Sequence, residues 1–312
     1  MSRKDLWSVP ALPGVLRAHA KECHLLIQRT DAARERLGDT PERRRIRDLI
    51  AAEARWCASA ELPLFWVTAP MAQVALDASQ DIPSVTPAMA PAPAGFLAVA
   101  GGLPPLPAED GADRTDTHGQ PITEPIAPSA VLWFPSPSGF HMTVYAHTSV
   151  MPSGRRIAQH GPLHELVEIT VPRAPDGGWP EALDGDPAHL ALLSWLGATW
   201  HLMMLPTVAE RSSIDPRTGG PTTPSTRTTA TPDPEVTCID LRPLREVTTD
   251  PDEPTPGTAR TYRHRWIVRG HWTRQPHGKG STQRKLLWRE SYIKGPAGAP
   301  LKRSRPVNVW RR

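Results

Sequence analysis

Proline is the residue that most limits what this chain can fold into. The 312 residues include 37 prolines, roughly twice the average share of about 5%. Because proline removes a backbone donor and interrupts helix interiors and central strands, its clusters divide the chain into short regular segments joined by irregular connections. The hydrophobic share of 39% is enough for a core. A length of 312 residues suits one large domain or two of ordinary size.

Residues 1–82 are predicted to form a helical N-terminal region. Apolar residues at helical spacing run from 12 to 37, where Gly38 supplies a stop. Thr40, followed by proline and glutamate, is a typical helix start, and a second helix is expected to run to about residue 60. A short strand at 62–70 and a third helix complete this region.

Residues 83–211 are predicted to form an α+β body with a proline-rich loop near 104–129. The segment 130–150 has the pattern of a β-hairpin, with an apolar strand, a Pro-Ser-Pro-Ser-Gly turn and an alternating strand. Another strand is expected at 164–172, although Leu166 and Val167 break its alternation. An apolar helix at 187–205 follows. Residues 212–235 are predicted to be a linker or a mobile loop.

Residues 236–312 are predicted to form a basic, β-rich C-terminal module that begins with a strand at 236–244. The expected fold class is α+β, with an antiparallel twisted sheet, helices packed on one face of it, and a basic β-hairpin at the C-terminus.

Positive charge is concentrated at this C-terminal end. Residues 260–312 contain fifteen Lys and Arg and one acid, Glu290, although the net charge of the whole chain is only +4. Such polarity indicates contact with nucleic acid or another polyanion. The alternative is that the basic end pairs with the acidic remainder of the chain, and the sequence leaves both open.

The stretch RHRWIVRGHWTRQ, residues 263–275, combines arginine, histidine and tryptophan without any acid. Read as one strand over 262–274 and paired with 284–293, it predicts a hairpin that is aromatic on one side and cationic on the other. Arginine suits phosphate, and an aromatic face either packs on the protein or stacks on bases. The residues expected to bind nucleic acid are Arg263, Arg265, Arg269, His271, Trp272, Arg274, Lys285, Arg289 and Lys294.

The same stretch offers groups for metal-independent RNA cleavage, which needs an acid, a base and cations on the phosphate. The catalytic candidates are His271, Arg269, Lys285 and Tyr292. His264 would lie on the opposite face of a regular strand from His271, unless a bulge at Gly270 changes the register. Whether the protein is an enzyme stays open.

No metal, cofactor or membrane partner is expected. Cys23, Cys57 and Cys238 have no zinc-finger spacing and are predicted to be buried free thiols. His264, His271 and His277 lack a nearby thiol or carboxylate. No apolar run approaches the ~18 residues that span a bilayer, and the N-terminus lacks a signal-peptide pattern. We expect a cytoplasmic protein.

The C-terminal segment resembles the signature of an uncharacterised family from high-GC Gram-positive bacteria and their phages and plasmids. The pattern is HRWxVRGHWxR, a glycine-containing loop, then WxxxYxKGP and PL. It falls here on His264, Arg265, Trp266, Val268, Arg269, Gly270, His271, Trp272, Arg274, Trp288, Tyr292, Lys294, Gly295, Pro296, Pro300 and Leu301. The resemblance implies a mobile-element setting.

The RGHW core is also similar, more loosely, to a C-terminal motif of a type V-A anti-CRISPR family. That resemblance implies action on the transcript of a target nuclease. Where that motif has a second histidine, this chain has Arg274 or no counterpart. Where the motif has WIPP, residues 288–291 read WRES.

The leading interpretation is a nucleic-acid-associated protein, with RNA preferred, whose basic hairpin contacts phosphate and which lowers transcript levels alone or through the translation machinery. A toxin-like ribonuclease that uses His271 is the second interpretation. The third is a non-enzymatic inhibitor or adaptor that docks on an acidic protein partner. DNA binding is a fourth, without a helix-turn-helix or zinc finger in support.

Overall fold

The computed structural model describes residues 7–83, 85–104, 126–137, 139–148, 161–173, 187–221, 234–243, 246–249, 263–296 and 298–302. Most of the predicted loop at 104–129, much of the predicted linker and Tyr262 lie outside these residues. Contacts divide the chain into two units, Met1–Leu241 (unit 1) and Arg242–Arg312 (unit 2).

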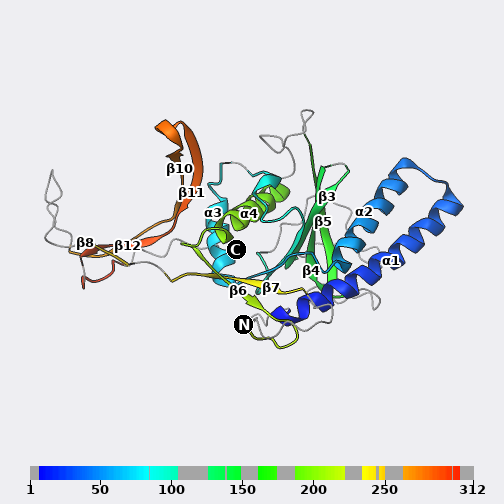
Figure 1. The fold of residues 1–312 in the computed structure, drawn as a ribbon, viewed down its shortest axis with the longest axis horizontal. Coiled ribbons are helices and arrows are strands. Elements are labelled where there is room, and N and C mark those ends of the chain that lie inside the picture. Colours follow the sequence, from blue (N-terminus) through cyan, green and yellow to red (C-terminus); the bar gives the residue numbers. More distant parts are fainter. Residues whose placement is uncertain are drawn as a thin grey trace. The chain divides into compact units, whose positions relative to one another are not determined.

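Unit 1 combines four α-helices with seven strands among its described residues (Figure 1). The helices are α1 (Leu12–Leu37), α2 (Pro41–Ala58), α3 (Ala69–Ser79) and α4 (Pro187–Met203), with short 3-10 turns at Val9–Ala11 and Pro87–Met89. The strands are β1 (Leu64–Val67), β2 (Gly95–Val99), β3 (Ala130–Ser136), β4 (Gly139–His147), β5 (Leu163–Pro172), β6 (Ala209–Ile214) and β7 (Val236–Leu241).

The helix boundaries predicted from local signals are confirmed. α1 ends before Gly38, whose φ of +89° is a conformation that glycine adopts without strain. The Thr40 hydroxyl accepts a hydrogen bond from the Arg43 backbone N–H at 3.2 Å and so caps α2. The predicted hairpin is present as β3 and β4, which pair from Ala130 opposite Tyr145 to Ser136 opposite Gly139.

The α+β fold class is confirmed, but the large sheet is mixed and not antiparallel. Its strand order is β5-β4-β3-β2-β1-β7-β6. β1 pairs in parallel with both β2 and β7, while the other neighbours are antiparallel. α3 lies between β1 and β2 in sequence and returns the chain to the starting edge, which makes the parallel pairing possible.

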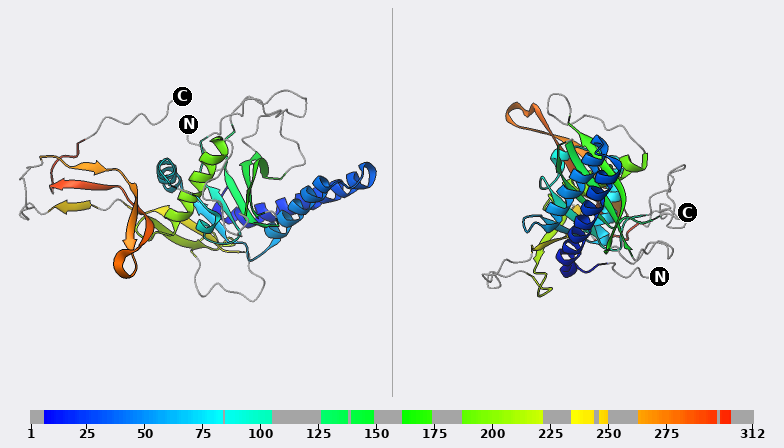
Figure 2. Two further views of the ribbon diagram at one scale, coloured as in Figure 1. Left: turned by 90° about the horizontal axis from the view of Figure 1, so that it is seen from above. Right: turned by 90° about the vertical axis from the view of Figure 1, so that its right-hand side faces the viewer.

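The helices cover both faces of this sheet, so the prediction of a single covered face was wrong. Leu64, Phe96 and Leu132 belong to the core cluster under α1 and α2. Successive strand residues point to opposite faces, and Trp133 instead contacts Trp200 of α4, with ring centroids 5.2 Å apart. Figures 1 and 2 show α1 and α2 on one side of the sheet and α3 and α4 on the other.

One irregularity in this sheet was visible in the sequence. Val144 and Tyr145 are consecutive in β4, yet their partners in β5 are Val167 and Glu165. Leu166 is therefore an extra residue, and its place matches the break in alternation at Leu166 and Val167. The bulge keeps Glu165 opposite Tyr145, which positions it beside the polar cluster described below.

Unit 2 consists of two small sheets. Its strands are β8 (Glu246–Thr249), β9 (Trp266–Val268), β10 (His271–His277), β11 (Gln283–Arg289) and β12 (Tyr292–Pro296), with a 3-10 turn at Lys279–Ser281. β10 and β11 form one antiparallel hairpin, and the other sheet has the order β8-β12-β9. The predicted C-terminal hairpin is confirmed, with a tip at 278–282.

The continuous strands predicted at 262–274 and 284–293 are each broken in two. The chain leaves one sheet at residues 269–270 and returns to it at 290–291. Gly270 is buried there, its N–H donates to the Ser291 hydroxyl at 3.0 Å, and a Cβ on it would lie 2.4 Å from the Trp288 ring. This close approach requires glycine and ends the strand.

The strand at 236–241, assigned to the C-terminal module from sequence, is β7 of the large sheet, and the contact boundary falls after Leu241. None of the helices in the described residues has both the length and the apolar character that crossing a membrane requires.

Candidate nucleic-acid interface and a buried polar cluster

The β10–β11 hairpin presents two different faces. Cross-strand partners share a face and alternate along the ladder, and the register pairs His271 with Arg289 and Gln275 with Lys285. His271, Lys285 and Arg289 therefore lie on one face, and all three are exposed. This confirms the predicted placement of Lys285 and Arg289.

The opposite face carries the tryptophans. Trp272 pairs with Trp288, and their rings meet edge to face with centroids 5.1 Å apart. Trp288 is 6% exposed, so packing explains its position. Arg274 and Arg284 lie on this same face, further toward the tip, and both are exposed. The hairpin is thus cationic on both faces near its tip, and aromatic on one face near its base.

The remaining predicted binding residues lie outside the hairpin. Arg265 has a structural role, since its Nε donates to the Ala299 carbonyl at 2.8 Å. Arg269 lies in the link between the two sheets, Lys294 is exposed on β12, and Arg263 is exposed just before the small sheet. The structure therefore groups five of the nine predicted residues in the hairpin: His271, Trp272, Arg274, Lys285 and Arg289.

Much of the C-terminal signature serves the fold of unit 2. Gly270 packs on Trp288, and Gly295, with a φ of +134°, passes so close to its neighbour that a Cβ would lie 2.7 Å from the His264 carbonyl oxygen. The Arg265 N–H donates to the Pro300 carbonyl, and the Lys302 N–H donates to the Arg265 carbonyl. Gly270 thus lies where the two sheets meet, and the other contacts lie within or beside the β8-β12-β9 sheet.

The groups suggested for RNA cleavage do not form a compact set. His271 is exposed, and its Nδ1 lies 3.4 Å from the Arg269 carbonyl. Lys285 is four residues along β11 from Arg289, the partner of His271, which is about 13 Å at ~3.3 Å per residue. Tyr292 belongs to β12 and pairs with Val268.

A cluster of buried polar side chains in unit 1 was missed by the sequence reasoning. His19 Nε2 and Glu53 Oε1 are 2.5 Å apart, and the Tyr145 hydroxyl donates to the same Glu53 oxygen. His19 is 8% exposed, Glu53 5% and Tyr145 0%. α1, α2 and β4 each supply one member, so the cluster joins the helical pair to the sheet.

Two further side chains of α1 border this cluster. The Glu22 carboxylate accepts a hydrogen bond from the Gly161 N–H and lies 3.8 Å from His19 Nδ1. Cys23 follows His19 by four residues, and the ligand atoms of His19, Cys23 and Glu53 all lie within 4.8 Å of one another. Cys23 and Cys57 are buried free thiols, as predicted, whereas Cys238 is only partly buried.

The charges of this cluster shift its acid–base behaviour. Burial by itself lowers the pKa of His19, but the polar contacts with Cys23, Glu22 and Glu53 outweigh it and raise the pKa to about 12. Desolvation raises the pKa of Glu165 to about 7, helped by the nearby carboxylates of Glu168 and Glu53. Burial and the charge of Glu53 also raise the pKa of Tyr145. The raised pKa of His19 means that its buried ring carries a positive charge at neutral pH.

The sequence contained part of this signal. His19, Glu22 and Cys23 share one face of a predicted helix, and so do Glu53 and Cys57. Nothing in the sequence, however, showed that the two helix faces meet each other and Tyr145.

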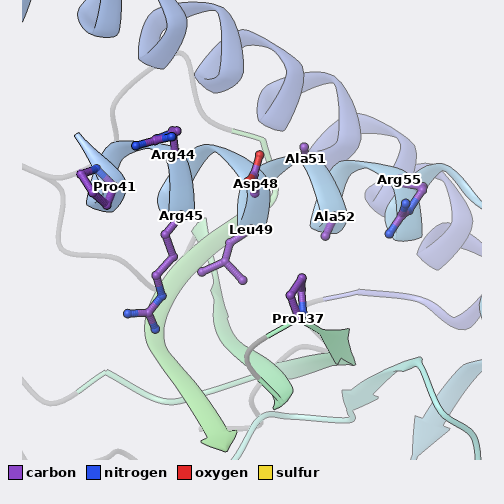
Figure 3. A pocket seen from close by; sticks show the side chains of 9 residues that line it. All are labelled: Pro41, Arg44, Arg45, Asp48, Leu49, Ala51, Ala52, Arg55 and Pro137. Carbon is purple, nitrogen blue, oxygen red and sulfur yellow. The ribbon is translucent and has the colours of Figure 1, made fainter. Parts of the chain in front are cut away.

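Unit 1 also has an open groove of about 670 Å³ between α2 and the turn of the β3–β4 hairpin (Figure 3). Its lining consists of Pro41, Arg44, Arg45, Asp48, Leu49, Ala51, Ala52, Arg55 and Pro137. Arg45 extends from α2 toward the sheet in this view. Burial and the charge of Arg45 help to lower the pKa of His141, against the opposing charge of Glu53.

No family model matches the sequence, and no curated protein matches it. A similar solved structure is the crystal structure of AcrVA2, a type V-A anti-CRISPR protein. It shares 13% identity, with a TM-score of 0.41 and coverage of 88% of this chain and 93% of that chain. At this TM-score the likeness carries no argument about fold or function.

Proposed function

We propose that the protein binds nucleic acid, with RNA preferred, through the β10–β11 hairpin of unit 2. One observation carries this proposal. Residues 271–289 contain five Lys and Arg and no acid, and all five are exposed: Arg274, Lys279, Arg284, Lys285 and Arg289. None of them forms an ion pair among the residues that the structure describes.

The geometry of the hairpin suits a phosphate backbone. A two-stranded ribbon places its side chains on two faces, and cations lie on both faces near the tip. Arginine offers paired donors to phosphate oxygens, and lysine a mobile point charge. Trp272 is half-buried beside Trp288, so its ring offers limited area for base stacking. Phosphate contact rather than base recognition is therefore the proposed source of affinity.

RNA cleavage is not part of this proposal. An acid–base pair would have to lie within about 3 Å of the reacting groups, and His271 has no such partner among the described side chains of the hairpin. We extend the proposal to a protein that lowers the level of a target transcript in a mobile-element or phage-conflict setting. This extension rests on the sequence resemblance alone.

The test uses labelled RNA, single-stranded and duplex, and DNA of the same sequence, with the full-length protein. We expect RNA to be bound and left intact, and Arg284→Ala/Lys285→Ala/Arg289→Ala to weaken binding at least about tenfold. The matched control, Arg29→Ala/Arg36→Ala/Arg44→Ala, removes three cations from α1 and α2 and should bind as the wild type does.

Two results would count against the proposal. If RNA binding is absent from the wild type, the cations of the hairpin serve a protein partner or the fold. If RNA is cut by the wild type and not by His271→Ala, the ribonuclease interpretation is correct instead.

A further inference from the structure

The polar cluster of unit 1 contains the donor types of a transition-metal site. His19 offers an imidazole nitrogen, Cys23 a thiol and Glu53 a carboxylate, and all three side chains are buried. Their ligand atoms lie within 4.8 Å of one another. Zinc binds these donors at ~2.0–2.3 Å, which places two ligand atoms of a tetrahedral site about 3.3–3.8 Å apart. Small side-chain movements would therefore bring the three onto one ion.

The way the sequence builds this cluster favours a common ligand. His19 and Cys23 are four residues apart on α1, so their side chains lie on the same helix face. Glu53 reaches them from α2, and Cys57 follows Glu53 on the same face of α2. An imidazole, a thiol and a carboxylate thus converge where the two helices meet the sheet, and Cys57 belongs to the adjoining apolar core.

One ring atom of the cluster lacks a hydrogen bond. His19 Nδ1 is buried and has no hydrogen-bond partner, and the Glu22 carboxylate lies 3.8 Å away. A buried polar atom without a partner is destabilising, so a further group at this nitrogen would complete the arrangement around the ring.

We propose that His19, Cys23 and Glu53 bind one zinc ion, or another divalent transition metal of similar preference, as a structural clamp between α1 and α2. The combination of thiolate and imidazole selects such metals over magnesium or calcium. The ion takes the place of the protons on the Cys23 thiol and the His19 ring, so binding releases these two protons. The Tyr145 hydroxyl, which donates to Glu53, orients that carboxylate from β4.

The site is distinct from the hairpin proposed to bind RNA, since all its residues belong to unit 1. A failure of either proposal leaves the other standing.

The test starts from untagged full-length protein, stripped with a chelator and titrated with Zn²⁺ or Co²⁺. We expect about one ion per chain, a Co²⁺ spectrum with the charge-transfer band of a thiolate ligand, and a higher Tm with zinc than with chelator. These three readouts need no variant. Absence of uptake, or a Co²⁺ spectrum without a thiolate band, would overturn the proposal.

Variants then locate the site. Cys23→Ser is expected to weaken metal affinity more than about 100-fold, since loss of an outer partner alone costs 10–100-fold. Cys238→Ser changes a thiol of β7 that lies outside the cluster and should bind as the wild type does. Equal binding by Cys23→Ser and the wild type would contradict the assignment, as would equal losses in both variants. Circular dichroism of each stripped variant separates loss of a ligand from loss of fold.

Discussion

The fold of unit 1 and the fold of unit 2 are each stabilised by different interactions. Unit 1 has helices on both sides of a seven-stranded sheet, and its buried apolar side chains include tryptophans such as Trp133, Trp195 and Trp200. Among the described residues of unit 2, Trp288 is the one apolar side chain that is buried. Unit 2 relies instead on main-chain pairing and on the close approach of Gly270 and Gly295 to their neighbours.

Because of this difference, the sequence of unit 1 mainly serves stability and the sequence of unit 2 mainly serves surface charge. Burial of apolar area stabilises unit 1, so its sequence is constrained mainly by packing. Unit 2 buries little apolar area and exposes its cations. Its surface charge is therefore the main feature that a binding partner would contact. Substitutions should therefore act on unit 1 through stability and on unit 2 through local geometry and binding.

Trp133→Ala is expected to have the largest effect, and to act on unit 1. The ring is fully buried between Phe65 and Trp200, and its Nε1 donates to the Ala92 carbonyl at 3.0 Å. Removal of such a side chain lowers the free energy of unfolding by about 3–5 kcal/mol. Chemical denaturation measures this loss.

The control for this change is Ile267→Ala in unit 2, where the side chain is 54% exposed. This change should lower the free energy of unfolding by less than about 0.5 kcal/mol. Comparable losses for the two variants would remove the contrast between the units.

Gly270→Ala is expected to have the next largest effect, and to act on unit 2. The new Cβ would lie 2.4 Å from the Trp288 ring and 3.0 Å from the Arg289 carbonyl, so the two sheets would have to shift. Overpacking of this kind costs about 1–3 kcal/mol. Amide hydrogen exchange should rise in β10 and β11 and stay unchanged in β1–β4.

Gly14→Ala is the matched control, because a Cβ there has room and the residue is helical. Alanine is the better helix former by up to about 1 kcal/mol, so this variant should be unchanged or more stable. If Gly270→Ala has no more effect than Gly14→Ala, the packing described for the junction is wrong.

Glu165→Gln is expected to have the smallest effect on stability, and one that depends on pH. The pKa of Glu165 is raised to about 7 in the folded protein, so the fold binds this proton more tightly than the unfolded chain, and stability falls as pH rises from about 4.5 to 7. Because Glu165 is exposed to solvent, screening limits this loss of stability to about 1 kcal/mol at most.

The variant should therefore be more stable than the wild type at pH 8 and equal to it at pH 4. Thermal unfolding at the two pH values measures this. A stabilisation of the same size at both pH values would show that the carboxylate charge is not its cause.

The elements that sequence reasoning predicted well are those with local signals. The cap at Thr40, the stop at Gly38 and the β3–β4 turn are each encoded within a few residues. β6 was missed because five of its six residues are not buried and no apolar pattern marks it. The parallel pairing of β1 with β7 joins segments some 170 residues apart, which no local pattern reveals.

The candidate sites follow the same rule. The cationic residues of the hairpin were predicted because charge is visible in composition, and the register of β10 with β11 confirms that Lys285 and Arg289 share a face. The breaks at 269–270 and 290–291 were missed, because strand-forming residues flank both and the sequence analysis considered Gly270 only as the site of a bulge. The His19, Glu53 and Tyr145 cluster was missed because its members come from three separate segments.

The most direct test of the proposed function is the salt dependence of RNA binding. Each phosphate contact on a single strand contributes about 0.7 to the slope of log affinity against log salt. Lys285→Ala/Arg289→Ala should make this slope less steep by about 1.4, while Arg29→Ala/Arg36→Ala in α1 should leave it unchanged. An unchanged slope for the hairpin variant, or an equal change in both, would contradict RNA binding through β10 and β11.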